Sequence, residues 1–155
     1  MKLARIVLFA VAALLALPAA AQTASDMQIL AQKIKADKKL VVAANMQLTE
    51  EEAKGFWPVY DAYQKDLAGI NKRMLGVIKS YAEVYNKGQV SDEAAKKLIN
   101  QAIAVEEAEV KLKRSYLPKL EKVLPGVKVA RYLQIESKIR ALVSYELAAQ
   151  IPLVN

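Results

Sequence analysis

Side chains that could do chemistry are few in this sequence of 155 residues. The chain contains no Cys and no His, which excludes thiol nucleophiles, imidazole bases and the commonest zinc ligands. One candidate group of carboxylates is Glu106, Glu107 and Glu109. Three carboxylates can share a proton or hold a cation, but no softer donor lies near them to complete a transition-metal site.

The spacing of the charges favours a structural role for these carboxylates. Acidic residues stand four positions before basic ones in seven pairs: Asp61–Lys65, Glu83–Lys87, Asp92–Lys96, Glu93–Lys97, Glu107–Lys111, Glu109–Lys113 and Glu136–Arg140. Such pairs are typical of solvated helix faces and stabilise a helix by about 0.2–0.5 kcal/mol each. The serines lie in neither a nucleophile elbow nor a Ser-x-x-Lys motif. We therefore predict a protein that is not an enzyme and uses no cofactor or metal.

The first 21 residues have the pattern of a secretory signal peptide. A short basic start contains Lys2 and Arg5, an apolar run covers residues 6–17, and small residues follow at 19–21. The run is too short for a membrane-spanning helix, which needs about 20 apolar residues. We expect cleavage before Gln22, a periplasmic location and a single helical domain over residues 22–155. Loss of the two basic residues lowers the formal net charge from +7 to +5.

Apolar periodicity predicts an all-α fold of four helices, over residues 26–46, 50–86, 92–123 and about 127–149. The second helix has the clearest pattern, with apolar residues spaced alternately four and three apart over four heptads. This seam is Phe56, Tyr60, Tyr63, Leu67, Ile70, Met74, Val77, Tyr81 and Val84. The short connections predict long antiparallel helical hairpins, arranged as a bundle or as an open cradle. Pro58 and Pro118 should bend or interrupt their helices.

Helix boundaries are marked by capping residues. Thr49 and Glu52 form a capping box at the start of the second helix, and Ser91 can cap the third. Gly88 can take the left-handed conformation at C′, after the second helix. Residues 124–126 predict a turn before the last helix.

The start of the second helix resembles a motif of a known family. Leu48-Thr49-Glu50-Glu51-Glu52 opens a long amphipathic helix after a signal peptide and a first helix, which resembles the Spy/CpxP (LTxxQ) group of periplasmic stress proteins. Glu stands where that family usually has Gln. At the place of the family's second motif the chain reads Val123-Leu124-Pro125-Gly126-Val127, without Thr or Gln. The resemblance implies a helical cradle, dimeric in that family, that binds unfolded envelope proteins without ATP.

Aromatic and basic side chains suggest a surface that binds partners. Adjacent residues point about 100° apart on a helix, so Phe56 and Trp57 cannot both lie in the seam. Long basic stems beside aromatic rings suit adaptable binding of acidic, partly unfolded chains. The predicted partner-binding residues are Phe56, Trp57, Lys111, Lys113, Arg114, Lys119 and Lys122. The alternative is that Trp57 packs on a neighbouring helix and the lysines keep the protein soluble.

The function predicted from the sequence is binding of unfolded or envelope proteins, as an ATP-independent chaperone-like or envelope-stress adaptor. The alternative is a specific interaction or sensory partner of one envelope protein, without general chaperone activity. Export argues against nucleic acid as a ligand, whereas the basic charge is compatible with weak contact with a membrane surface. A homodimer is compatible with the long helices. The apolar tail, residues 148–155, could fold back on the bundle or bind a partner's groove.

The signal-peptide prediction can be tested by mass spectrometry of the protein expressed with its full sequence in a Gram-negative host. The periplasmic fraction should contain a chain that begins at Gln22, because Ala19 and Ala21 form a small-x-small cleavage site. Replacement of Ala19 and Ala21 by bulky residues should cause uncleaved precursor to accumulate. An intact chain that still begins at Met1 and stays in the cytoplasm would contradict the prediction.

Overall fold

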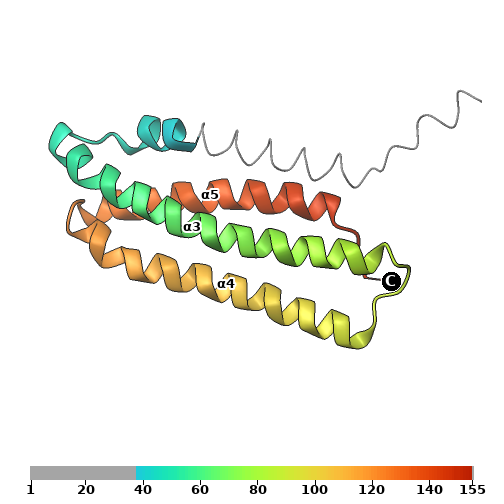
Figure 1. The fold of residues 1–155 in the computed structure, drawn as a ribbon. Helices are drawn as coiled ribbons and strands as arrows, with labels where there is room; N and C mark the ends of the chain where they lie inside the picture. Colours follow the sequence, from blue (N-terminus) through green and yellow to red (C-terminus); the bar gives the residue numbers. More distant parts are fainter. Residues whose placement is uncertain (1–37, 155) are drawn as a thin grey trace, which may run out of the picture. The chain divides into compact units, whose positions relative to one another are not determined.

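The computed structural model describes residues 38–154, and the predicted signal peptide at 1–21 lies outside them (Figure 1). The described residues are helices and short connections without a β-strand, which confirms the all-α prediction. Residues 38–46 are helical and belong to the predicted first helix, whose earlier part is outside the described range. The chain divides into two units between Ala44 and Asn45, and the second unit is described below. The single domain predicted over 22–155 stays a prediction.

Three long helices make up the second unit: α3 at Glu50–Tyr85, α4 at Asp92–Glu121 and α5 at Gly126–Gln150. Each predicted range agrees with its helix to within two residues at either end. α3 runs through Pro58 and α4 through Pro118 without interruption. A proline removes one backbone donor from a helix, and packing of the apolar faces maintains both helices despite that loss.

The predicted caps are present in the structure. The Thr49 hydroxyl accepts a hydrogen bond from the Glu52 backbone N–H at 3.3 Å, and the Glu52 carboxylate accepts one from the Thr49 N–H at 2.8 Å. Ser91 caps α4 by accepting from the Ala94 N–H at 3.2 Å. Gly88 has a φ of 104°, but it lies two residues after the C-cap Asn86 rather than at C′. Pro125 is the N-cap of α5 and forms no side-chain cap.

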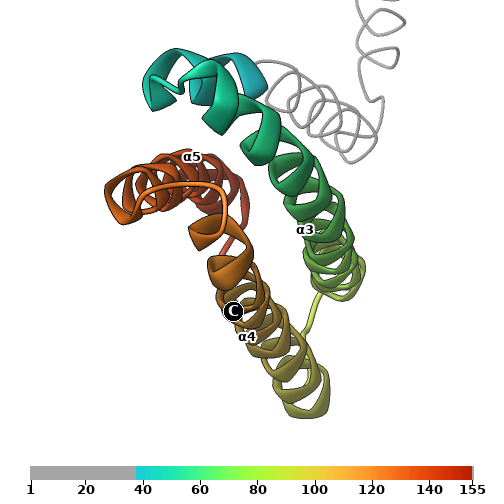
Figure 2. The same cartoon turned by 90° about the vertical axis from the view of Figure 1, so that its left-hand side faces the viewer.

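α3 and α4 form an antiparallel hairpin, and α5 runs back beside them in the same direction as α3 (Figures 1 and 2). The core lies toward the end of the hairpin where α4 turns into α5. Its buried apolar residues are Phe56, Tyr60, Tyr63 and Leu67 of α3, Val105, Tyr116 and Leu120 of α4, Leu124, and Val129 and Tyr132 of α5. The remaining seam positions of α3, from Ile70 to Val84, are only half-buried.

Gly55 allows α3 to approach the turn between α4 and α5. A Cβ atom built at Gly55 would lie 3.0 Å from both Cβ and Cγ1 of Val123, a distance at which a neighbour must move. By contrast, a Cβ at Gly69 or Gly76 would meet no atom within 4 Å. Packing against Val123 therefore favours glycine at position 55, although glycine in a helix costs about 1 kcal/mol relative to alanine.

Gln47 forms the connection to α3 with a backbone conformation that is uncommon for a side chain of its type. Its φ is 48°, in the left-handed region that glycine prefers. Lys128 of α5 donates from Nζ to the Gln47 carbonyl at 2.9 Å and to the Glu52 carboxylate. Arg131 contacts the Gln47 amide oxygen at 3.5 Å. The basic start of α5 thus holds this strained residue in place.

The packing at Gly55 can be tested by comparing two glycine-to-alanine variants. Gly69→Ala should raise the free energy of unfolding by about 0.5–1 kcal/mol, because alanine favours the helix and meets open space. Gly55→Ala gains the same propensity but crowds Val123, and overpacking costs about 1–3 kcal/mol. We expect urea denaturation followed by circular dichroism to give a lower stability for Gly55→Ala than for Gly69→Ala.

Val123→Gly provides the internal control for this comparison, because it removes both the Cβ and the Cγ1 atom that an alanine at position 55 would crowd. In the Val123→Gly background Gly55→Ala should become as favourable as Gly69→Ala. Equal stabilisation by the two alanines in the wild-type background would contradict the close approach.

Candidate binding surface

Phe56 and Trp57 belong to one cluster of aromatic rings. Phe56 is completely buried, with its ring centroid 5.1 Å from that of Tyr132 on α5 and 5.0 Å from that of Trp57. Trp57 is half-buried and also contacts Tyr60 edge-on at 5.3 Å. Phe56 was predicted to bind partners, but in this structure it has no exposed surface and acts as a core residue. Such ring pairs are each worth about 0.5–1.5 kcal/mol beyond the area they bury.

A buried polar network lies within this aromatic core. Gln64 donates from Nε2 to the Glu136 carboxylate at 2.8 Å and to the Tyr132 hydroxyl at 3.2 Å. The sequence spacing predicted Glu136 as the solvated partner of Arg140, and this interpretation is wrong. Glu136 is buried, whereas Arg140 pairs with Glu109 of α4 and donates to Asn71 of α3 at 3.0 Å. Because a buried carboxylate is costly without donors, the network fixes how α5 packs.

The buried tyrosines are held in their neutral form. Burial, together with the negative charge of Glu136, raises the pKa of Tyr60 and of Tyr63 to about 12. Burial raises the pKa of Tyr116 to about 12 as well, and its hydroxyl donates to Asp66 at 2.6 Å. Burial also raises the pKa of Tyr132 far above its ordinary value. The Tyr63 hydroxyl is buried without a hydrogen-bond partner among the described residues.

The predicted basic residues of α4 do not form one patch. Lys113 is half-buried and pairs with Glu109 at 3.0 Å, near Arg140 of α5. The Lys119 ammonium lies 4.0 Å from the centre of the Tyr116 ring, a cation–π contact. Lys111, Arg114 and Lys122 are exposed. Two of the predicted residues therefore support the packing of α4, and three are free for contact with a partner.

An exposed row of aliphatic side chains on α4 was not predicted from the sequence. Ile99, Ile103 and Val110 are 60%, 47% and 55% exposed, and their spacing of four and seven residues places them on one face of the helix. We call these three residues the α4 apolar row. The signal was present in the sequence, since none of the three fits the buried stripe of α4, which contains Val105 and Tyr116.

Charged residues surround the α4 apolar row. Lys96 precedes Ile99 by three residues, and Arg114 follows Val110 by four, so each lies one turn beyond an end of the row. Glu106 interrupts the row between Ile103 and Val110. This face of α4 therefore combines apolar contact area with charge, an arrangement suited to binding another polypeptide.

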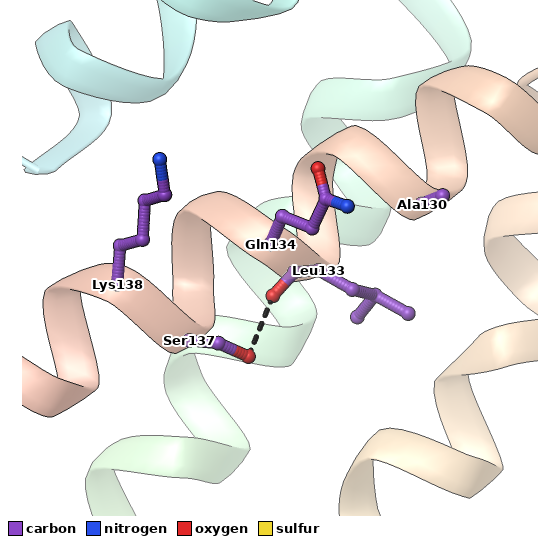
Figure 3. A pocket seen from close by; sticks show the side chains of 5 residues that line it. All are labelled: Ala130, Leu133, Gln134, Ser137 and Lys138. Atoms are coloured by element: carbon purple, nitrogen blue, oxygen red, sulfur yellow. Dashed lines mark hydrogen bonds between the residues drawn. The ribbon is translucent and has the colours of Figure 1, made fainter.

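The α5 helix carries a shallow, open hollow (Figure 3). Its lining side chains, from Ala130 to Lys138, all lie on one helix. The Ser137 hydroxyl donates to the Leu133 carbonyl at 2.9 Å, which is a bond within the helix. The lining residues contain no acid–base pair that could activate this hydroxyl.

Within residues 38–154, no group of three or more acidic side chains is placed to hold a metal ion. Among the helices of the same region, none combines the length and apolar character required to cross a membrane.

The C-terminal tail is attached at one point. The Tyr81 hydroxyl donates to the Pro152 carbonyl at 2.9 Å, so the tail folds back to the end of α3. Leu153 and Val154 nevertheless remain exposed.

Comparison of the chain with protein-family models, with curated proteins and with solved structures finds no match in any of the three. The resemblance to the Spy/CpxP group therefore remains a prediction that rests on the motif at Leu48–Glu52.

The raised tyrosine pKa values predict a loss of stability in alkali. Unfolded tyrosines release their protons near pH 10, whereas buried Tyr60, Tyr63 and Tyr116 retain theirs to about pH 12. The unfolded state therefore binds fewer protons in this window, and the free energy of unfolding should fall between pH 10 and 12. Below pH 10 these phenols contribute no pH dependence. Urea denaturation at a series of pH values measures the effect.

Tyr63→Phe is the matched variant for this test. It removes one titrating phenol whose hydroxyl has no partner, so the fall in stability above pH 10 should be less steep than in the wild type. An identical pH dependence in the variant would contradict the assignment of Tyr63 as a buried, neutral phenol.

Proposed function

We propose that the protein is an exported helical binding protein that holds unfolded or envelope polypeptides in the periplasm without ATP. The observation that carries the proposal is the α4 apolar row, in which three aliphatic side chains share one exposed helix face. Large aliphatic side chains grouped on a surface are characteristic of protein interaction sites.

The chemistry of the surface around the row favours polypeptide clients. Ile99, Ile103 and Val110 offer contact area to apolar segments, and Arg114 and Lys111 offer charge to acidic residues beside them. Long basic side chains adapt to different partners because their stems are flexible and partly apolar. Such a surface binds many sequences weakly rather than one sequence tightly.

The buried ionisable groups support binding rather than catalysis. Glu136, Tyr132 and Gln64 form hydrogen bonds with one another inside the core, and Tyr116 is bonded to Asp66. The polar atoms of these groups are therefore used in hydrogen bonds that stabilise the packing of the helices.

The proposal is tested with the full chain and several chemically denatured client proteins, by light scattering during client aggregation. We expect the wild type to slow aggregation at near-stoichiometric ratios without nucleotide. The triple variant Ile99→Ser/Ile103→Ser/Val110→Ser should bind clients about 100-fold more weakly, since each buried aliphatic side chain contributes about 1 kcal/mol. Serine and isoleucine have similar helix propensities, so α4 should be preserved.

A matched control is available on α5. Leu142 and Tyr145 are 68% and 72% exposed, so Leu142→Ser/Tyr145→Ser removes comparable exposed apolar surface away from α4. The control should retain protection of clients. Equal loss in both variants would show that general hydrophobicity is responsible, and absence of protection by the wild type at low salt would overturn the chaperone-like activity.

The second candidate function is binding of one dedicated envelope protein. It is favoured by the interruption of the row by Glu106, because a fixed charge within an apolar surface selects a matching partner. In this case a pull-down should return a single stoichiometric partner that is lost in the triple α4 variant, while no general protection of clients is seen.

A further inference from the structure

The outward face of α3 carries a second regular row, of different chemistry. Lys65, Ala68, Lys72, Leu75 and Lys79 are spaced three, four, three and four residues apart, which places them on one face of the helix. All five are exposed. We call them the α3 basic row. The buried seam residues Tyr60, Tyr63 and Leu67 mark a different face of the same helix.

The three lysines of this row form no ion pair within the described region. Asp61 lies one helical turn before Lys65 and Glu83 one turn after Lys79, and α3 contains no acidic residue between Asp66 and Glu83. Arg73 adds one more positive charge to the same stretch. The three lysines span 14 residues, which corresponds to about 21 Å along the helix.

The space beside the row is open. A Cβ atom at Gly69 or Gly76 would meet nothing within 4 Å, so the backbone is bare next to the lysines. Leu75 is 41% exposed and stands between Lys72 and Lys79. The row therefore consists of long cationic side chains that flank one apolar side chain on a smooth helix surface.

We propose that the α3 basic row is a docking surface for an anionic lipid bilayer. Each lysine near such a membrane contributes about 1 kcal/mol to the free energy of binding. The lysine stems can extend along the interface while their ammonium groups reach the headgroups. An exposed leucine between them can enter the boundary between headgroups and acyl chains. The proposal is independent of the proposed function, which depends on α4.

Lipid fits this row better than other anionic partners. A nucleic acid backbone would satisfy the lysines but gives no favourable environment to Leu75. A protein partner would need carboxylates opposite each lysine, whereas a membrane presents anionic groups at any spacing. Three lysines contribute about 3 kcal/mol to the free energy of membrane binding, so the attachment is weak and reversible. Added salt should weaken it further, because at an ionic strength of about 0.1 M charges are screened from one another beyond about 10 Å.

The experiment measures sedimentation of the full chain with vesicles of phosphatidylcholine alone or with added phosphatidylglycerol. We expect binding that depends on phosphatidylglycerol and falls as salt rises. Lys65→Gln/Lys72→Gln/Lys79→Gln should weaken this binding about 100-fold. Lysine and glutamine have similar helix propensities, and circular dichroism verifies the fold. Any contribution of residues 1–21, which include Lys2 and Arg5, is common to all variants, so the comparison between variants isolates the contribution of the α3 basic row.

The matched control removes the same charge from another helix. Lys96→Gln/Lys97→Gln/Lys111→Gln replaces three exposed lysines of α4 and should retain binding within about twofold. Leu75→Ser should weaken binding severalfold without a change in the salt dependence. Equal loss in the two triple variants, equal binding to both kinds of vesicle, or stronger binding to oligonucleotides than to anionic vesicles would each overturn the proposal.

Discussion

The structure depends on a single costly interaction, the burial of the Glu136 carboxylate between α5 and α3. A buried charge needs hydrogen-bond donors at fixed positions, and Gln64 provides one at 2.8 Å. Two residues that must meet in this way define the register of α5 along α3. The Tyr63, Tyr116 and Tyr132 rings then fill the space around the pair.

The same register continues along the whole length of the two helices. Among the contacts that join α3 or its N-cap region to α5 and the tail, four are distributed along the helices: Glu52 to Lys128, Gln64 to Glu136, Asn71 to Arg140 and Tyr81 to Pro152. Their sequence separations are 76, 72, 69 and 71 residues. A nearly constant separation is what two parallel helices of equal rise require. Because the inner faces are used in this packing, the faces that carry the α4 apolar row and the α3 basic row remain exposed.

The sequence was sufficient to predict the helices because their ends are encoded locally. Thr49, Glu52 and Ser91 act on backbone groups within three residues of themselves, and the heptad seam identified the face of α3 that contains the core. Local patterns could not predict which charges are buried, since Glu136 and Arg140 have the spacing of an ordinary surface pair. The partners that decide their positions, Gln64 and Glu109, are distant in the sequence.

The contacts of several predicted binding residues could not be predicted for a related reason. Phe56 and Trp57 are neighbours in an aromatic pair, and the seam alone did not establish that Phe56 would be fully buried with its ring against Tyr132 of α5. Lys113 and Lys119 are attached to Glu109 and Tyr116, contacts that depend on how α4 is rotated in the bundle. The α4 apolar row is visible in the sequence only after the buried stripe has been identified, because both stripes contain the same types of residue.

The position of Trp57 gives the molecule a built-in optical probe. It is the single tryptophan of the chain, and it touches the rings of Phe56 and Tyr60 at the edge of the cluster that joins α3 to α5. The fluorescence of an indole responds to the polarity around it, so the emission of Trp57 reports changes at this aromatic cluster without an attached dye. Loosening of the aromatic cluster can thus be followed by tryptophan emission, and melting of the α3–α4 hairpin can be followed separately by helical ellipticity.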